Sequence, residues 1–246
     1  MLEFYSITDN GKNRSVNQDF LFATEKEIGP LPNLFIIADG MGGHNAGDFA
    51  SKCAVEVVIN EVQNSTVTVS EESDIVNIIS NAIQKANEIV YKIASVKEGM
   101  VGMGTTMVVC TYYRDKLHIF NVGDSRLYVM KKELRQITED HSYIEEMVRL
   151  YGVSREELGE NEFKNRITRA VGAELLVEVD YFTVDTNEKM YVLMCTDGLT
   201  NMMTDKEIKE KLLSKQTIMQ KSIDLIETAN YNGGLDNISV ILMRIL

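Results

Sequence analysis

Four aspartates stand where an apolar, strand-like run meets glycine or a small polar residue. Asp39 follows LFIIA, Asp124 follows FNVG, Asp197 follows VLMCT, and Asp236 lies just before the run ISVIL. A carboxylate at a strand end is held by a rigid scaffold and projects into the adjacent crevice, and a neighbouring glycine lets the backbone approach an ion. One Asp-Gly pair is usually an ordinary turn, but four such strand ends together indicate a shared site.

Carboxylates that converge in a partly buried crevice repel one another unless cations neutralise them. Ligand sets made only of oxygen favour Mg²⁺ or Mn²⁺ over zinc, which prefers histidine and cysteine. The three cysteines, Cys53, Cys110 and Cys195, are far apart in apolar runs without metal-binding spacing. We therefore expect buried free thiols in a reducing compartment and a divalent-metal site built from oxygen.

The segment GKNRSVNQDF adds Arg14 and Asp19 to this set. A guanidinium presents a planar fork of donors that suits the oxygens of a phosphate group. Taken alone, Arg14 is better interpreted as a solvated surface arginine, and the phosphate interpretation draws its support from the aspartates.

The elements that must position these residues follow from hydrophobic periodicity. Helical spacing predicts helices over Ala46–Val62 and Glu71–Ala94, the second capped by Ser70 or Ser73. Capping boxes mark two later starts, Ser154 with Glu157 and Thr204 with Glu207, and a last helix runs from about Thr217 to Asn230. Strands are expected at Leu34–Ala38, Thr105–Tyr113, Leu117–Val122, Leu127–Met130, Met190–Cys195 and Ile238–Ile245.

Consecutive strands joined by short polar gaps, such as Arg114-Asp115, predict a mostly antiparallel sheet with the long helices over its outer faces. The fold class is therefore α+β, in layers. No linker-like composition interrupts the 246 residues, so we expect a single domain over 1–246. The polar, acidic stretch from Tyr143 to Lys164 is interpreted as a mobile surface flap.

The balance of charge excludes some partners. With 37 acidic against 25 basic residues the net charge is −12, which argues against a nucleic-acid-binding protein, since such proteins carry a clustered basic face. The N-terminus lacks a signal-peptide pattern, and no run reaches the roughly 18 apolar residues of a membrane span. We expect a cytoplasmic protein that does not enter a membrane.

Eight motifs occur together in order: RSVNQD, ADGMGGHNAGDFAS, MGTT, VGDSRLY, ITEDHS, TRAVG, CTDGLTNMM and GGLDNISVIL. This set resembles the metal-dependent serine/threonine protein phosphatases of type 2C, in their short bacterial form, over nearly the whole chain. The resemblance implies a four-layer αββα sandwich, in which two packed antiparallel β-sheets are flanked by helices.

The resemblance also implies a role for each site residue. Asp39 would bridge two Mn²⁺ or Mg²⁺ ions, with the carbonyl of Gly40 at the second ion and Asp19 near it through a water. Asp197 and Asp236 would hold the first ion. Asp124 would form, with Asp197, the third-ion site of bacterial members. Arg14 would bind the substrate phosphate.

A hydroxide that bridges two ions would then attack phosphorus in line, without a protein nucleophile. Animal members carry a histidine directly after the Asp-Gly of this motif to protonate the leaving group, where this chain has Met41. A thioether cannot donate a proton, so the candidates are His44 and a metal-bound water.

Other motif residues have structural interpretations. We expect His141 to be a satisfied loop histidine, His118 a strand residue, and Arg169 a partner of a buried carboxylate. Thr105 and Thr106 suit the start of a strand. In the flap, NEFKN lacks a proline that relatives often carry, so no substrate preference is transferred.

The sequence thus predicts a phosphatase of phosphoserine and phosphothreonine in proteins, a monomer whose partners are phosphoprotein substrates and whose action reverses a cognate serine/threonine protein kinase. Two other classes stay open. A non-catalytic phosphoprotein-binding module is disfavoured because no metal aspartate is missing. A two-metal nuclease or phosphodiesterase is disfavoured by the acidic charge balance.

Overall fold

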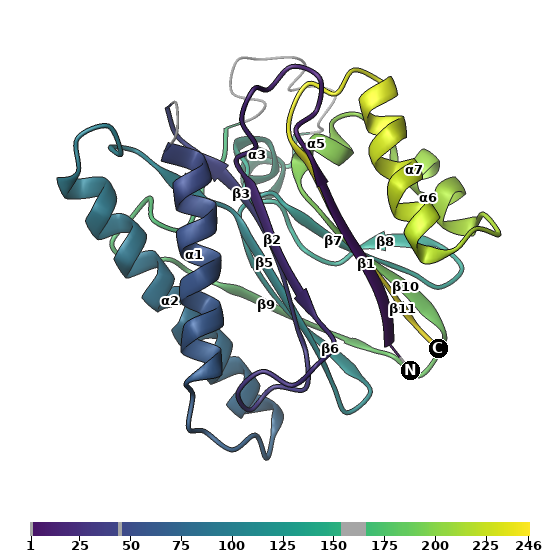
Figure 1. The fold of residues 1–246 in the computed structure, drawn as a ribbon, viewed down its shortest axis with the longest axis horizontal. Coiled ribbons are helices and arrows are strands. Elements are labelled where there is room, and N and C mark those ends of the chain that lie inside the picture. Colours follow the sequence, from purple (N-terminus) through teal and green to yellow (C-terminus); the bar gives the residue numbers. More distant parts are fainter. Residues whose placement is uncertain (1, 44–45, 154–165) are drawn as a thin grey trace.

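Two antiparallel sheets pack face to face in a computed structural model that describes residues 2–43, 46–153 and 166–246 (Figure 1). One sheet has the order β1 (Leu2–Asp9), β11 (Ile238–Ile245), β10 (Met190–Cys195), β7 (Arg126–Met130) and β8 (Leu134–Gln136). The other has the order β2 (Asp19–Thr24), β3 (Leu34–Met41), β5 (Met107–Tyr113), β6 (Lys116–Val122) and β9 (Asp180–Asp185), and the short β4 (Gly104–Thr105) pairs with β3.

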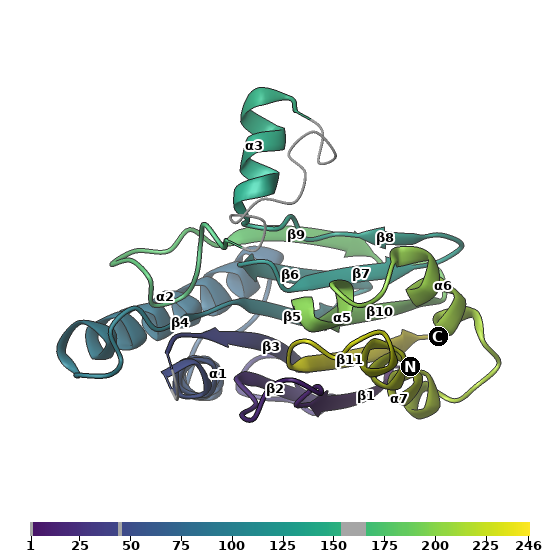
Figure 2. The ribbon, with the colours of Figure 1, turned by 90° about the horizontal axis from the view of Figure 1, so that it is seen from above.

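Helices cover both outer faces (Figures 1 and 2). The sheet that contains β3 carries α1 (Ala46–Gln63) and α2 (Glu72–Val96), and the sheet that contains β11 carries α5 (Asp197–Thr200), α6 (Asp205–Leu213) and α7 (Ile218–Tyr231). The layer order is therefore helix, sheet, sheet, helix, and the predicted α+β, four-layer αββα sandwich is confirmed.

Alternation along the strands explains the layers, because successive side chains of a strand point to opposite faces. In β3, Ile36 packs under α1 and α2, whereas Phe35 and Ile37 pack between the sheets. In β10, Leu193 faces the α6–α7 layer and Val192 faces the other sheet. Strands buried on both faces are continuously apolar, which made them recognisable in the sequence.

Every strand predicted from the sequence is present, with one interruption. The run over Thr105–Tyr113 divides into β4 and β5 at Thr106, whose hydroxyl accepts a hydrogen bond from the backbone N–H of Asp39 at 2.9 Å. The strands β1, β2 and β9 were not predicted. Their side chains are mostly half-buried, so they lack the continuous apolar signal.

Helix starts were predicted with mixed success. Thr204 and Glu207 form the expected capping box at the start of α6, and Thr217 caps α7. The helix α2 is capped at Glu71 and not at Ser70 or Ser73, because the carboxylate of Asp74 accepts the N–H groups of Ser70 and Glu71. The proposed box of Ser154 and Glu157 lies outside the described residues.

The helix α3 (Tyr143–Tyr151) begins the predicted flap and projects away from the sandwich (Figure 2). None of its residues is buried. The predicted range 143–164 is described only to residue 153, and the chain resumes at Arg166. The peptide N–H of Tyr143 donates to the carbonyl of Arg166 at 2.9 Å, so the two ends of this excursion lie side by side.

No helix in the described ranges is both long and apolar enough to cross a membrane.

Candidate active site

Four predicted aspartates lie at the same end of the sandwich because of where their strands stop. Asp39 lies two residues before the end of β3, and Asp124 lies between β6 and β7. Asp197 begins α5, two residues after the end of β10, and Asp236 precedes β11 by two residues. Both sheets contribute, so the carboxyl groups meet across the gap between the sheets. Asp19 joins them because β2 pairs with β3 in a register that places it opposite Asp39.

The backbone of Asp39 is fixed by two threonines. Its N–H donates to the hydroxyl of Thr106 at 2.9 Å, and its carbonyl accepts the hydroxyl of Thr105 and the N–H of Thr106, both at 2.8 Å. Both threonines are fully buried. The prediction that they simply suit a strand was incomplete, because their hydroxyl groups hold the backbone of Asp39; the motif MGTT was the available signal.

Gly40 lies where no side chain fits. A Cβ atom there would stand 1.9 Å from the carbonyl oxygen of Gly47, in the first turn of α1. The N–H of Gly40 donates to the carbonyl of Gln18 at 3.0 Å. Gly40 therefore packs closely against both α1 and the segment that leads into β2.

Asp19 is buried, and one of its carboxyl oxygens is well satisfied. Oδ2 accepts the hydroxyl of Ser239 at 2.7 Å and that of Thr196 at 2.8 Å, whereas Oδ1 is buried without a hydrogen-bond partner. Burial raises the pKa of this carboxyl to about 7, although the two hydroxyl donors lower it. Neither donor was predicted, since each is distant in sequence from Asp19.

Asp197 and Asp124 show the same pattern of one unsatisfied oxygen. Oδ1 of each is buried without a hydrogen-bond partner, and Oδ2 of Asp197 accepts from the amide of Asn201 at 2.9 Å. Burial, followed by the charge of Asp197, raises the pKa of Asp124 to about 8. Burial and the neighbouring Asp236 also raise the pKa of Asp197.

The pKa of Asp39 is also raised, and by the largest number of neighbouring charges. Burial first, and then the charges of Asp19, Asp197, Asp124 and Asp236, hold the pKa of Asp39 well above its usual range. Like charges that shift one another's ionisation lie within a short distance of each other in a poorly solvated space. The five aspartates predicted from the sequence therefore form one electrostatic cluster.

Arg14 lies at the edge of this cluster. Its guanidinium donates to Oδ2 of Asp236 at 2.8 Å, and its side chain is 49% exposed. The loop that carries it is held by Asn237, whose amide accepts the N–H of Gln18 at 2.9 Å and donates to the carbonyls of Asn10 and Val16. Asn237 is buried, and sequence reasoning assigned it no role.

A divalent cation fits this donor set. Three buried oxygens without partners, on Asp19, Asp124 and Asp197, are costly unless something compensates them, and carboxylate oxygen is what Mg²⁺ and Mn²⁺ prefer. Among the described residues, however, no three carboxyl, imidazole or thiol groups already converge as closely as the ligands of a bound ion do. The cluster is thus a suitable ligand set that is not in a closed coordination geometry.

The remaining predictions have mixed outcomes. His141 is a satisfied loop histidine, and Arg169 pairs with Asp180 at 2.7 Å, as expected. His118 is buried in β6, where Nδ1 is 2.8 Å from the hydroxyl of Tyr181. Cys53, Cys110 and Cys195 are free thiols. His44 lies outside the described residues.

A layered αββα sandwich with an aspartate cluster between its sheets defines the class of a phosphatase of type 2C. The family model for protein phosphatase 2C matches residues 8–235. The chain belongs to this family.

Named relatives agree with this assignment. The chain is 39% identical to the serine/threonine phosphatase stp of Listeria innocua, over 96% of this chain and 93% of the relative. It is 32% identical to the protein phosphatase PhpP of Streptococcus pneumoniae, over 98% and 97% of the two chains.

Solved structures agree as well. The serine/threonine phosphatase of S. agalactiae has a TM-score of 0.92 at 35% identity, with 99% of each chain covered. The serine/threonine phosphatase Stp1 of Staphylococcus aureus has a TM-score of 0.91 at 32% identity, with 100% of this chain and 96% of that chain covered.

Proposed function

We propose that this chain, acting as one catalytic domain over residues 1–246, hydrolyses phosphoserine and phosphothreonine in proteins with the help of Mn²⁺ or Mg²⁺. The observation that carries the proposal is the cluster of Asp19, Asp39, Asp124 and Asp197, in which three buried carboxyl oxygens have no partner among the described residues. Relatives that are named serine/threonine phosphatases support the choice of substrate.

The assignment of ligands is the one that the resemblance to type 2C phosphatases implies. Asp39, Asp197 and Asp236 would hold the first ion, and Asp39 and the carbonyl of Gly40, with Asp19 nearby, would hold the second. Asp124 and Asp197 would hold a third ion. When bound, two such ions lower the pKa of a shared water, so that hydroxide forms near neutral pH.

The protein's own contribution is to hold its ligands in place before substrate arrives. Thr105 and Thr106 fix the backbone of Asp39, and the hydroxyl groups of Thr196 and Ser239 orient Asp19. Groups that are already oriented need no reorganisation as charge develops in the transition state.

Arg14 is the group that would bind the substrate phosphate. Its present contact with Asp236 is partly exposed, and such ion pairs contribute only about 0–1 kcal/mol. The guanidinium can therefore exchange this carboxylate for phosphate oxygens at little cost, and a bidentate contact would orient the phosphoryl group for in-line attack.

The leaving alkoxide needs a proton, and His44 or a metal-bound water would supply it. Met41, which follows Asp39-Gly40, cannot. We further propose that the protein works as a monomer in the cytoplasm and reverses a serine/threonine protein kinase there.

The experiment is hydrolysis of p-nitrophenyl phosphate and of a phosphothreonine peptide by the purified protein with Mn²⁺, compared with Asp197→Asn. Turnover by the native chain alone, abolished by a chelator and restored by Mn²⁺, is expected. Equal rates for both proteins would refute the proposal. Tight binding of the peptide without cleavage would favour a binding module, and Mn²⁺-dependent cleavage of nucleic acid would favour a nuclease.

A further inference from the structure

A histidine outside the aspartate cluster is bonded directly to the turn that carries Asp124. The N–H of Gly123 donates to Nδ1 of His141 at 2.9 Å, and the N–H of His141 donates to the carbonyl of Gly123 at 3.0 Å. His141 is only 8% exposed. Two reciprocal hydrogen bonds thus join His141 to the residue immediately before Asp124.

The turn has little freedom on its other side. Gly123 has a φ of +104°, and a Cβ atom there would lie 2.6 Å from Cγ2 of Thr106. Thr106 is the residue that accepts the N–H of Asp39, and its hydroxyl also bonds Ser125 at 2.8 Å. Gly123 is therefore held between Thr106, which positions Asp39, and the ring of His141.

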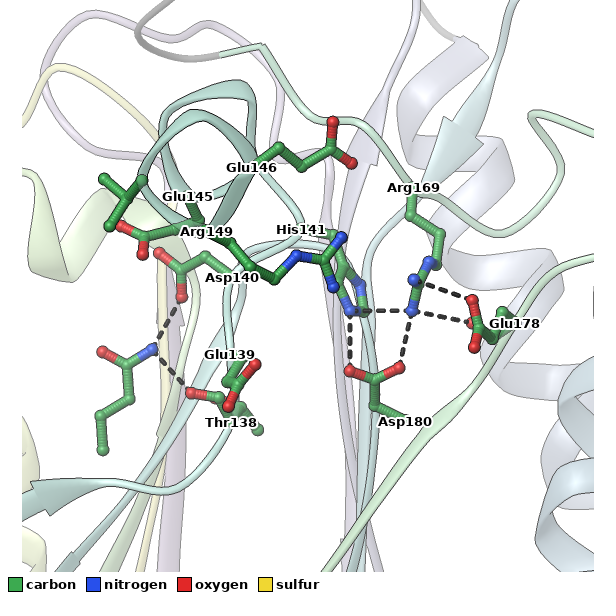
Figure 3. A pocket seen from close by; sticks show the side chains of 12 residues that line it. Thr138, Glu139, Asp140, His141, Glu145, Glu146, Arg149, Arg169, Glu178 and Asp180 are labelled. Carbon is green, nitrogen blue, oxygen red and sulfur yellow. Dashed lines mark hydrogen bonds and ion pairs between the residues drawn. The ribbon is translucent and has the colours of Figure 1, made fainter. Parts of the chain in front are cut away.

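The hydrogen bond from Gly123 determines the tautomer of His141. A backbone N–H can only donate, so Nδ1 must be the unprotonated nitrogen and the ring proton is on Nε2. Nε2 lies 3.1 Å from Oδ2 of Asp180, which accepts a hydrogen bond from it. Nη1 of Arg169 lies 2.9 Å from the same Nε2 and donates to the other oxygen of Asp180 at 2.7 Å, so that Asp180 faces both donors (Figure 3). A carboxylate on one ring nitrogen is a common means of fixing the orientation of the other.

Asp180 begins β9, and Arg169 lies in the segment that leads from Arg166 towards β9. The N–H of Thr168 donates to the carbonyl of His141 at 2.9 Å. Figure 3 shows the ring of His141 and the guanidinium of Arg169 converging on Asp180. The three residues line a cavity of about 480 Å³ that residues of α3 also line. The mechanism proposed above uses none of these three side chains.

We propose that His141 is a positioning residue for Asp124: Nδ1 holds the Gly123–Asp124 turn, and Asp180 holds the ring so that Nδ1 faces that turn. This inference rests on the proposed role of Asp124 as a metal ligand. Outer partners of metal ligands typically change metal affinity or activity by about 10- to 100-fold when they are lost. His141 would thus determine how readily the third ion binds.

Two substitutions distinguish the roles of the two ring nitrogens of His141. In His141→Asn, the amide oxygen occupies the place of Nδ1 and can accept the N–H of Gly123, but nothing reaches Asp180. In His141→Gln, the longer side chain reaches Asp180 and leaves Gly123 without an acceptor. His118→Gln, a buried histidine of β6 outside the site, is the matched control for general destabilisation.

The first measurement is amide hydrogen exchange of Gly123 in the metal-free protein. Slow exchange is expected in the native chain and in His141→Asn, with exchange faster by about 10-fold or more in His141→Gln, because a lost hydrogen bond exposes the amide to opening. The second is the Mn²⁺ concentration that gives half-maximal hydrolysis of p-nitrophenyl phosphate. It should rise about 10-fold or more in His141→Gln, by clearly less in His141→Asn, which keeps an acceptor for Gly123 but loses the contact with Asp180, and stay near the native value in His118→Gln.

Equal exchange and equal Mn²⁺ dependence in the Asn and Gln variants would overturn the proposal. If His141→Gln does not fold, Asp180→Ala replaces it, because this variant keeps the imidazole ring and removes the carboxylate that orients it. A smaller rise in the half-maximal Mn²⁺ concentration is then expected. No rise would again overturn the proposal. Asp124→Asn tests the proposed metal-binding role of Asp124 separately. If this variant leaves the Mn²⁺ dependence unchanged, that role is wrong. The exchange rate of the Gly123 amide still reports on its hydrogen bond to His141 in that case.

Discussion

Asp39, a proposed metal ligand, illustrates how a site residue depends on residues that do no chemistry. Its N–H has a buried hydroxyl as its acceptor, and Thr106 also lies against Gly123 and bonds Ser125. The β-branched side chain suits a strand, and its hydroxyl accepts the backbone N–H of Asp39 at the point where the strand is interrupted. One residue therefore has both a structural and a positioning role.

Thr106→Val keeps the shape of this side chain and removes the hydroxyl. The N–H of Asp39 would be left buried without an acceptor, so we expect a loss of about 1–3 kcal/mol in the free energy of unfolding and a fall of at least about 10-fold in kcat. Thr106→Ser should retain most of both. Chemical denaturation and steady-state kinetics measure them, and a Val variant as active as the Ser variant would contradict the assignment.

Asp197→Asn should separate stability from activity. Burial and Asp236 raise the pKa of Asp197, so its ionised form destabilises the fold at alkaline pH when no cation compensates it. We expect the Asn variant, in chelator at pH 8, to have a higher Tm than the native chain, while activity with Mn²⁺ falls by more than about 100-fold. A lower Tm together with retained activity would show that Asp197 is neither buried charge nor ligand.

The loop between β3 and α1 shows how elements position the site. Gly40 lies directly beneath the first turn of α1, where a Cβ atom would be 1.9 Å from the carbonyl oxygen of Gly47. Backbone atoms cannot rotate away as a side chain can, so the helix itself would have to shift. The glycine spacing of this motif is thus a condition for packing α1 against β3.

Gly40→Ala is expected to destabilise the protein by about 3 kcal/mol or more, the upper end for overpacked sites. Gly43→Ala, just after β3, is the matched control, because a Cβ atom there meets nothing within 4 Å. Denaturation midpoints of the two variants give the comparison. Equal midpoints would mean that α1 is free to move at its start.

At the start of α6, Thr204 and Glu207 exchange hydrogen bonds with each other's backbone. Thr204→Ala should cost about 1 kcal/mol of stability and leave phosphatase activity unchanged, since α6 packs on the outer face of its sheet. Thr204→Ser keeps the cap and should be neutral. Loss of activity in the Ala variant at a temperature where it is folded would contradict this separation.

Across the whole molecule, the two sheets bring together carboxyl groups that lie up to 217 residues apart, from Asp19 to Asp236. Each sheet is stabilised by its own helix layer and by the apolar layer that the sheets share. A cluster of like charges is tolerated because this large core offsets its cost. Stability and function therefore conflict at one end of an otherwise conventional sandwich.

Because of this conflict, the stability of the folded protein should depend on pH with a definite sign. The folded pKa values of Asp19 and Asp124 are raised to about 7 and about 8, so the folded state holds their protons more tightly than the unfolded chain does. Their contribution to stability is full below about pH 4, the ordinary pKa of aspartate, and is lost as pH rises through 7 to 8.

Mn²⁺ binds the ionised carboxylates, so the rise in Tm that Mn²⁺ causes should increase from pH 5.5 to pH 8.5. Thermal unfolding with chelator and with Mn²⁺ at several pH values measures it, and using the difference in Tm cancels groups that do not bind the metal. A Tm shift that is equal at both pH values, or larger at pH 5.5, would contradict the raised pKa values.

Local patterns in the sequence determined much of this protein. Continuous apolar runs predicted the central strands, periodicity predicted α1 and α2, and Asp39, Asp124, Asp197 and Asp236 could be singled out because each meets a strand end. These signals are local, since periodicity, caps and turns depend on residues a few positions apart. The half-buried β1, β2 and β9 carried no such signal and were missed.

Only the tertiary structure decided which groups surround each aspartate. Ser239 bonds Asp19 across 220 residues, and Asn237 holds the loop of Arg14 across a similar span. The bond between His141 and Gly123 depends on how β6, β7 and the segment after β8 are stacked. Such contacts are set by the order of strands within two sheets and by the packing between them, and no pattern along the chain encodes that arrangement directly.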